Sequence, residues 1–576
     1  MESLEELVER TQRTFIKLSL GILGGILLLI LLTWGGCHAY QGWEEGHQVR
    51  RAVAFLRDGN FKSAALSARR ALQLNSNSTG AMRIMAQLAE KSRDRAALDW
   101  RRKIVELEPN SRPEALALSN CALQFGDIRT AEKSLTRIDD SGKQTAAFHA
   151  AAARLASARK NSAEAKNEFG KALRLAPNDE SYQMEYALAC LEQPVATERE
   201  EGLRILEKLR GSPAQRSTAT RSLFLDGVAH RHDPQELRSL ARDLQSYPEA
   251  LFTDRLLYLD VLRRLRDSEY AIYLTNIEKD ASSKPANLAA LLSWMSANDL
   301  SLIAIDFAKP LPAKILNEWP VPWAMAEAYA KISDWTALEK LTTNANWDQF
   351  DFLRRAFLTR ALRSESNAVA TGREWAEAVK SASAQSQSLL LLTRIIYDWG
   401  WKSESIDLLW QLAKYPEVQF EALHTLYLHY AKAHDTQGLH RVLSRLNEID
   451  PGDLKVQNNL AQISFLLNVD PERARKRVSN LYGKEPSNAA YVSTYAFSLY
   501  ANGDVKGALS VMTTLREDQL QEPPLAAYYG IFLAASGEKM KAREYLERGK
   551  QADLLPEEKA LVDKALANLN PRGQRE

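Results

Sequence analysis

Cysteine is scarce in this 576-residue chain, with only three residues, at positions 37, 121 and 190. So few and so scattered cysteines exclude a disulfide framework and a zinc site. Cys121 and Cys190 lie in apolar stretches where we expect helices, and a free cysteine in such a place behaves as a small hydrophobic residue. We therefore interpret both as core residues.

An excess of either charge is also absent. The chain has 75 Lys and Arg against 73 Asp and Glu, which gives a formal net charge of +2. A near-neutral chain lacks the global basic charge that is typical of nucleic-acid binding. We therefore expect no nucleic-acid partner.

Catalytic and metal-binding motifs are missing as well. The sequence holds no GxSxG, no Walker-type glycine-rich loop, no HExxH and no paired CxxC. His230 and His232 form the densest group of metal-ligand types, but they stand in a polar break before Pro234, which we interpret as a solvated loop. We expect no enzymatic activity, no cofactor and no metal.

What the chain does contain is a repeated helical unit. The clearest copy, Ala146–Asp179, reads as two short amphipathic helices with a break at Lys160-Asn161. Pro177 ends the unit, because proline cannot continue a helix. The second helix carries an apolar stripe at helical spacing, formed by Ala165, Phe169, Ala172 and Leu173.

The unit recurs at a constant interval. Ala97, Ala131 and Ala165 follow one another at equal spacing, and the same interval separates Gly503 from Gly537. A helix-turn-helix unit with a period of about 34 residues resembles the tetratricopeptide repeat (TPR), whose pattern has small residues, an aromatic residue and a proline at set positions. Those positions are occupied by Ala153, Ala165, Phe169 and Pro177. The resemblance implies an all-α fold, an α-α superhelix or TPR-like solenoid.

One long apolar segment precedes the repeats. Residues 18–36 carry no charge and, as a helix, would span roughly 25 to 30 Å, which matches a bilayer core. Arg10, Arg13 and Lys17 lie before this segment, whereas residues 35–49 contain no Lys or Arg. The positive-inside tendency then predicts an N-terminus in the cytoplasm and repeats on the other side of the membrane, which is the periplasm in a Gram-negative bacterium. The chain thus resembles an N-terminally membrane-anchored bacterial TPR protein, and we expect it to be single-pass in the inner membrane.

Two other interpretations of this segment stay open. A lipoprotein signal would be cut before Cys37, since Gly35-Gly36-Cys37 resembles the end of a lipobox. A cleaved signal peptide would need a shorter apolar run and a cleavage site of small residues. If the segment stays as an anchor, Gly21 and Gly25 form a GxxxG pair through which two such helices could pack as a homodimer.

The pattern predicts an order of segments along the chain. We expect a cytoplasmic amphipathic leader at 1–17, the transmembrane anchor at 18–36, an N-terminal TPR block at 45–180, degenerate helical repeats at 181–318, Trp-rich TPR-like repeats at 319–417, a C-terminal TPR block at 418–556, a capping helix at 557–569 and a disordered tail at 570–576.

The TPR resemblance also implies a binding groove, lined by the first helix of each repeat. Carried onto the best-registered copies, the groove positions are Arg83, Gln87, Asn120, Arg154, His424, Asn458 and Gln462. An ordinary solvated helix face would show the same polar residues. The family's carboxylate clamp is not expected, because Asn459 fits one of its places while Ala490 and Thr494 stand where it has basic residues.

Tryptophan gathers in the middle of the chain, where nine of the twelve lie between residues 294 and 410. Trp399 and Trp401 are a candidate aromatic site, since exposed aromatics mark interfaces and sugar-stacking surfaces. Packing within the repeats is the alternative explanation.

We expect a membrane-anchored TPR scaffold that mediates protein–protein interactions in envelope complex assembly, with residues 18–36 in the lipid bilayer. One alternative is a glycan- or peptidoglycan-binding envelope protein that uses the Trp-rich segment. Another is a receptor-like TPR protein that faces the cytosol.

Overall fold

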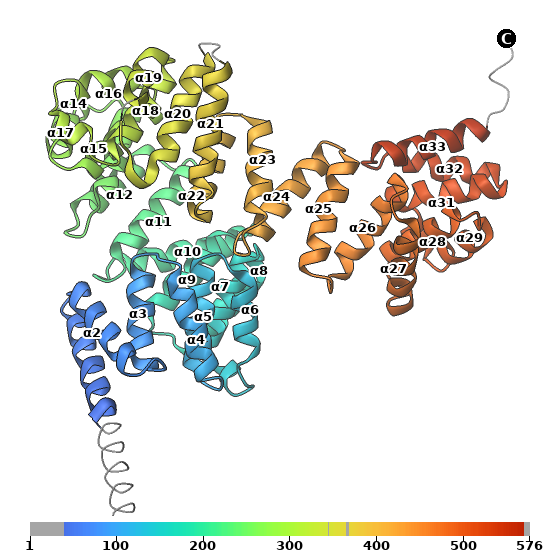
Figure 1. Ribbon diagram of the computed structural model, residues 1–576, viewed down its shortest axis with the longest axis horizontal. Coiled ribbons are helices and arrows are strands. Elements are labelled where there is room, and N and C mark those ends of the chain that lie inside the picture. The colour runs from blue at the N-terminus through green and yellow to red at the C-terminus, as the bar shows by residue number, and fades with distance from the viewer. Residues whose placement is uncertain (1–39, 344, 365–367, 570–576) are drawn as a thin grey trace, which may run out of the picture. The chain divides into compact units, whose positions relative to one another are not determined.

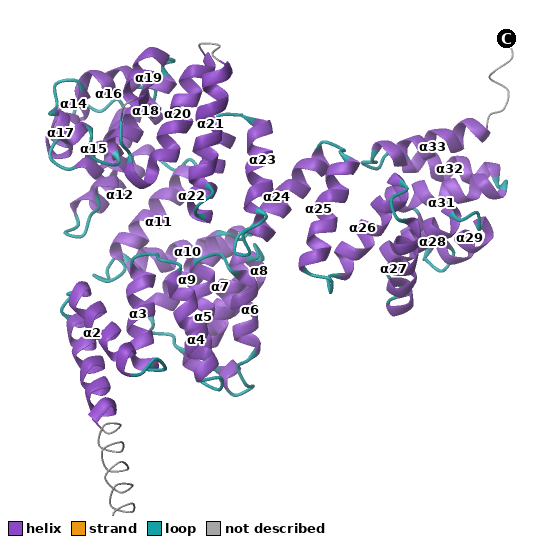
Figure 2. Ribbon diagram, viewed as in Figure 1, coloured by secondary structure: helices purple, strands orange, loops and turns teal. Residues whose placement is uncertain are grey.

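The computed structural model describes residues 40–343, 345–364 and 368–569. Within these residues all regular structure is helical (Figures 1 and 2), so the prediction of an all-α fold built of successive helix pairs is confirmed. The expected segments 1–17, 18–36 and 570–576 lie outside the described residues, and so do Gly21, Gly25 and Cys37. No helix in the described part is both long and apolar enough to cross a membrane.

The chain divides into two compact units, Met1–Trp294 and Met295–Glu576, and the division falls within α15 (Pro285–Ala297). In the first unit, the first helices of the pairs are a helix described from residue 40 to 57, then α3 (Thr79–Lys91), α5 (Arg112–Gln124), α7 (Ala146–Ala158), α9 (Glu180–Leu191), α11 (Arg216–Ala229) and α13 (Phe252–Arg264). Their second helices are α2 (Phe61–Leu74), α4 (Ala96–Leu107), α6 (Ile128–Thr136), α8 (Ser162–Leu175), α10 (Ala196–Leu209), α12 (Pro234–Ser246) and α14 (Tyr270–Ala281).

The second unit repeats the scheme. Its first helices are α18 (Val321–Lys331), α20 (Asp351–Ser364), α22 (Ser386–Asp398), α24 (Gln419–Lys432), α26 (Leu454–Leu467), α28 (Ala489–Ala501) and α31 (Pro523–Ser536). Its second helices are α16 (Ser301–Ala308), α19 (Trp335–Thr343), α21 (Ala368–Ala382), α23 (Lys402–Leu412), α25 (Thr436–Ile449), α27 (Pro471–Lys484), α29 (Val505–Met512) and α32 (Lys539–Gly549). Short helices α17 (Ala313–Leu316) and α30 (Glu517–Leu520) interrupt it, and α33 (Pro556–Leu569) follows the last pair.

The spacing of the helices matches the period of the sequence. In the first unit, α3, α5, α7 and α9 begin at nearly equal intervals along the chain, and from α22 to α31 the first helices of the second unit do the same. Ala97, Ala131 and Ala165 are all fully buried in second helices. The periodic alanines therefore mark the positions where helices approach most closely.

Residues 181–318, expected to hold degenerate pairs, contain well-formed helices. First helices in this part begin at Glu180, Arg216, Phe252 and Pro285, and the first two of these intervals are longer than those between α3 and α9. A search at a fixed interval loses its register when the connections lengthen. The helical stripes therefore stay visible in the sequence while the period does not.

The turn inside a pair has a simple local cause. Gly126 takes a positive φ of 75°, a conformation that costs glycine little, and reverses the chain after α5. Asp127 follows it and accepts a hydrogen bond from the backbone N–H of Thr130, which caps α6. Gly503 and Asp504 build the same turn before α29.

The close approach of α9 and α10 also depends on one glycine, Gly202, which lies within α10 and faces α9. A Cβ atom built on Gly202 would lie 2.7 Å from the carbonyl oxygen of Ala187 and 3.0 Å from Cβ of Cys190. Backbone atoms cannot yield as a side-chain end can. The spacing of these two helices therefore requires a residue without a side chain.

We predict that Gly202→Ala lowers the stability of the α9–α10 pair by about 1 to 3 kcal/mol, because the added methyl group overpacks the contact. Gly372→Ala is the matched control, since a Cβ there meets nothing within 4 Å and alanine favours the helix. Hydrogen exchange of residues 180–209 measures the effect. Equal protection in the two variants would contradict the prediction.

Candidate functional site

The first helices of the first unit are linked by a row of polar side chains. Arg154 on α7 donates to both carboxylate oxygens of Glu185 on α9, at 2.7 to 3.0 Å. The same guanidinium donates to Oδ1 of Asn120 on α5 at 3.0 Å. The structure therefore brings together two of the expected groove residues, Asn120 and Arg154, and ties three consecutive first helices.

Arg83 on α3 makes similar contacts two repeats earlier. Its guanidinium pairs with Glu114 on α5 at 2.7 Å and with Glu108 at 2.6 Å. Burial alone would lower the pKa of Arg83, but hydrogen bonds and attraction from Glu114 and Glu108 raise it overall. Gln87, one turn further along α3, is exposed. Arg83 thus ties α3 to α5, while the amide of Gln87 is accessible.

The tie between neighbouring first helices recurs further along the unit. Arg221 on α11 pairs with Asp254 on α13, at 2.8 and 2.9 Å, and Asp254 is buried. Asp254 also accepts from the backbone N–H of Leu251 and so caps its own helix. Sequence reasoning missed these acids. A basic residue followed by an acid about one repeat later was the available signal.

Gln87, Asn120 and Arg154 occupy the ninth position of α3, α5 and α7, respectively. Packed helices lie roughly 8 to 10 Å apart, and an extended peptide rises roughly 3.3 Å per residue. Every third residue of an extended peptide would then meet the same position of the next first helix. Amide and guanidinium groups at that position can donate to, and the amides accept from, a peptide backbone.

In the second unit the three expected groove residues lie in different surroundings. His424 on α24 is exposed. Asn458 on α26 is only 2% exposed, and its Oδ1 has no hydrogen-bond partner among the described residues. Gln462, also on α26, donates to the hydroxyl of Tyr528 at 3.0 Å and to Glu558 at 2.9 Å. Of the three, only His424 has an exposed side chain.

Glu558 is one of the two acceptors that engage the side-chain amide of Gln462. It belongs to α33, which contacts α31, α32 and also α26, two repeats back. Tyr528 donates its hydroxyl to Glu558, and burial together with that carboxylate raises the pKa of Tyr528 well above its ordinary value. The second oxygen of Glu558 accepts from the backbone N–H of Leu555 at 2.9 Å. The C-terminal helix is therefore fixed by a buried polar network that the sequence did not reveal.

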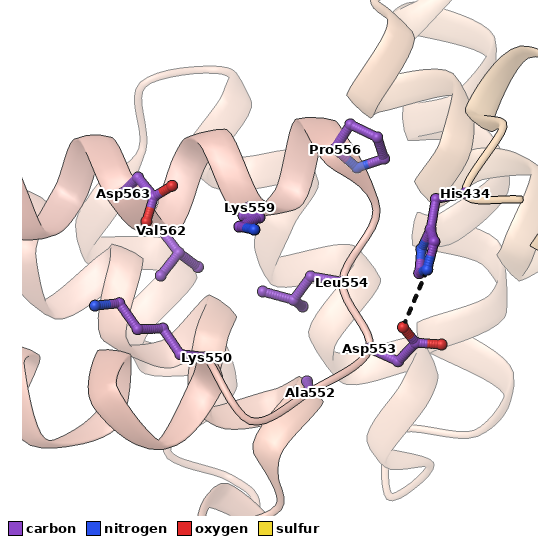
Figure 3. Close-up of a pocket in the computed structure, with 9 residues that line it drawn as sticks. All are labelled: His434, Lys550, Ala552, Asp553, Leu554, Pro556, Lys559, Val562 and Asp563. Atoms are coloured by element: carbon purple, nitrogen blue, oxygen red, sulfur yellow. Dashed lines mark ion pairs between the residues drawn. The ribbon is translucent and has the colours of Figure 1, made fainter. Parts of the chain in front are cut away.

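A crevice of about 800 Å³ opens beside this helix (Figure 3). His434, in the turn before α25, faces Asp553 of the α32–α33 connection, with 3.3 Å between Nε2 and Oδ1. Lys550 and Lys559 bring positive charge and Asp563 negative charge to the rim. Both side chains of the His434–Asp553 contact are solvent-accessible, so the contact contributes little to stability. No group of three or more metal-ligand side chains occurs in the described residues.

The tryptophans of the second unit pack mainly against one another. Trp399 meets the buried ring of Phe357 edge to face at 4.9 Å, and Trp401 lies 5.3 Å from Trp399. Trp375 contacts Trp401 at 5.9 Å. Both residues of the expected aromatic site are half-buried. Trp399 therefore packs against the core through Phe357 and is also partly exposed to solvent.

Two arginines of α20 cover these rings. The guanidinium of Arg360 lies 4.6 Å from the ring of Trp399, and that of Arg363 lies 4.4 Å from the ring of Trp401. Burial lowers the pKa of Arg360, and no described carboxylate lies within ion-pair distance, so the indole faces supply its stabilisation. Sequence analysis missed both arginines. No repeat position distinguishes them.

A cavity of about 360 Å³ adjoins Trp401. Two of its walls are the indole rings of Trp375 and Trp401. The other lining residues are Thr359, Arg363, Thr371 and Glu404, whose polar groups can form hydrogen bonds, together with Ala368 and Gly372. Glu404 is already paired with Arg363 at 2.7 Å. An aromatic wall with polar neighbours can hold a sugar ring by stacking and hydrogen bonding.

No known family profile matches the chain, and no curated protein matches it. The similar solved structures include the APC/C hetero-tetramer Cut9-Hcn1, with 14% identity over 80% of this chain and 98% of that chain, at a TM-score of 0.29. Pseudomonas aeruginosa pilF shares 15% identity over 42% of this chain and 92% of its own, at a TM-score of 0.25. Naa15/Naa10 bound to HypK-THB shares 14% over 91% and 78%, at a TM-score of 0.25. At such low scores, the fold assignment depends on the helix pairs themselves.

The network around Glu558 yields a prediction. Tyr528→Phe removes one donor to a buried carboxylate, and we expect the docking of α33 to weaken by about 1 to 3 kcal/mol. Faster hydrogen exchange in residues 556–569 reports the loss. Tyr529→Phe is the control, since the hydroxyl of Tyr529 has no hydrogen-bond partner in the described structure. Unchanged exchange in Tyr528→Phe would show that the network does not hold the helix.

The packing of Trp399 yields another prediction. Trp399→Ala empties the space beside Phe357, and we expect it to lower the free energy of unfolding of the second unit by about 2 kcal/mol or more. Tyr397→Ala, two residues away and 72% exposed, should change it by less than about 0.5 kcal/mol. Urea unfolding followed by tryptophan fluorescence measures both variants. A loss no larger for Trp399→Ala than for Tyr397→Ala would leave Trp399 without a core role.

Proposed function

We propose that this chain is a membrane-anchored TPR-like scaffold that binds other proteins during assembly of an envelope complex. The observation that supports the binding role is the row of ninth-position side chains on α3, α5 and α7, of which Asn120 and Arg154 are held in place by their contacts with each other and with Glu185. A solenoid presents such a row as one extended surface. Partners of this surface would be peptide segments of other proteins.

The mechanism follows from the geometry of the row. Gln87 offers a free amide, and Asn120 keeps donor capacity after it has accepted from Arg154. Because Glu185 of the next repeat holds Arg154, and Arg154 holds Asn120, these two side chains need little further ordering when a peptide binds. Several contacts of modest strength add up along an extended segment.

The anchoring part of the proposal depends on residues 18–36, whose uncharged run is long enough to cross a bilayer. An anchor confines the scaffold to a surface and raises its effective concentration toward membrane-bound partners. The charge bias before the segment supports repeats on the periplasmic side of the inner membrane. The cytosol-facing, receptor-like arrangement is the opposite orientation of the same anchor.

A glycan-binding function is a second candidate, favoured by the cavity beside Trp401. Binding there would show as retention of the protein on immobilised envelope polysaccharide. Trp401→Ala should abolish the retention, whereas Tyr397→Ala should leave it unchanged. Retention that does not depend on Trp401 would remove this candidate.

The scaffold proposal predicts where partners touch the chain. A photoreactive residue at position 87, on the exposed part of the row, should cross-link a small set of proteins in cells. The same residue at position 133, exposed on the second helix α6, should not give those products. Asn120→Ala should reduce the yield from position 87, because it removes a neighbouring contact. Equal products from positions 87 and 133 would contradict binding through the first helices.

The orientation needs its own test, with a protease-sensitive tag placed after residue 576. Cleavage of the tag by external protease in spheroplasts, with the cells otherwise intact, is the expected result. A tag that is protected until the membrane is lysed would contradict periplasmic repeats and favour the cytosol-facing arrangement.

A further inference from the structure

The N-terminal helix, described from residue 40 to 57, carries an outward stripe of aromatic and basic side chains. Tyr40 is 62% exposed and Trp43 is 61% exposed. The ring of Trp43 stacks on His47, with 5.6 Å between the centroids and 7° between the planes. At about 100° per residue, one stripe roughly 120° wide contains Tyr40, Trp43, His47, Arg50, Arg51, Ala54 and Arg57.

The opposite side of this helix is packed. Ala52 is fully buried, and Val49 and Val53 lie against a core cluster that includes Ala68 of α2 and Ile84 of α3. One face of the helix is therefore fixed to the first repeats. The face that carries the stripe has no cover in the described structure.

The arginines of the stripe differ from most others in this unit. Arg83, Arg154 and Arg221 are tied to carboxylates of a neighbouring repeat. For Arg50, Arg51 and Arg57, by contrast, no described carboxylate lies within ion-pair distance, and all three are exposed. The adjoining α2 adds three further exposed cations without a described ion pair, Lys62, Arg69 and Arg70. Residues 40–78 hold these six cations against three acids, Glu44, Glu45 and Asp58, so the first repeat has an excess of positive charge.

We propose that this stripe lies on anionic lipid headgroups. The inference rests on the proposed anchoring by residues 18–36 and adds which surface of the folded part meets the membrane. Tryptophan and tyrosine prefer the membrane–water interface, and here they stand at the end of the helix next to the uncharged run. The arginines that follow on the same face would be attracted to anionic headgroups.

The length of the helix sets the orientation. Arg57 lies roughly 25 Å along the axis from Tyr40, at 1.5 Å per residue. In an upright helix the arginines would stand more than a Debye length, about 8 Å, above the headgroups and would feel little attraction. A helix that lies along the surface, as basic amphipathic helices do, brings the aromatic and basic residues to the same depth.

The test uses the full-length chain in lipid nanodiscs. A fluorophore is attached at Ala54→Cys, within the stripe, and Cys37→Ser prevents labelling there, while Cys121 and Cys190 are buried. Headgroup spin-labelled lipid then quenches the dye only if the stripe touches the surface. We expect strong quenching in discs that contain phosphatidylglycerol, weaker quenching in phosphatidylcholine discs, and a decrease with added salt. A dye at Lys133→Cys, on α6, should stay unquenched.

Replacement of the three arginines gives the decisive comparison. Arg50→Gln, Arg51→Gln and Arg57→Gln together should reduce quenching at position 54 by about threefold or more, because the attraction of three charges is lost. The control combines Arg473→Gln, Lys476→Gln and Arg477→Gln on α27, which removes the same charge elsewhere and should change nothing. Absent quenching, or equal quenching in neutral discs, would overturn the inference while the chain still co-elutes with discs. A chain that fails to enter discs would instead contradict the proposed anchor.

Discussion

The structure depends on close approach between helices at small residues. Each helix pair has too little apolar surface to form a core alone, so it must bury its faces against the next pair. Ala97, Ala131 and Ala165 are fully buried where this happens, and Gly202 meets backbone atoms of α9. Any larger side chain at these places would separate neighbouring helices. This steric requirement explains why small residues recur at a constant interval in the sequence.

Polar contacts then fix what close packing leaves free, namely the position of each first helix relative to the next. Arg154–Glu185 and Arg221–Asp254 do this in the first unit. In the second unit, Tyr528 and Glu558 make the equivalent contact with a neutral donor, and Gln462 extends it to a third helix. Such ties hold the row of first helices rigid. Rigidity lowers the ordering cost when a flexible peptide binds.

Much of this fold could be predicted from the sequence, because its causes are local. The turn at Gly126-Asp127 and the buried stripe around Ala165 each follow from a few neighbouring residues. The helices of residues 181–318 were expected, but the longer intervals between their starting residues hid the period. The prediction of all-helical, TPR-like pairs therefore succeeded where connection lengths are constant.

The environment of the candidate site residues could be predicted much less well. Gln462 meets Glu558, which lies far beyond one repeat along the chain, and Arg363 meets Glu404 at an interval that is not a repeat length. Neither contact follows from helical periodicity. The same holds for Asn458, whose burial depends on how neighbouring helices pack and not on its repeat position. Position within a repeat predicts the helix that a residue belongs to, but not what covers its side chain.

Hydrogen exchange on the chain purified together with its native partners would test the central claim most directly. If partners bind along the first helices, amides of α3, α5 and α7 should exchange more slowly in the complex than in the isolated chain. Amides of α4, α6 and α8 should be unaffected. Slower exchange confined to the second helices, or no difference anywhere in residues 79–191, would contradict the account.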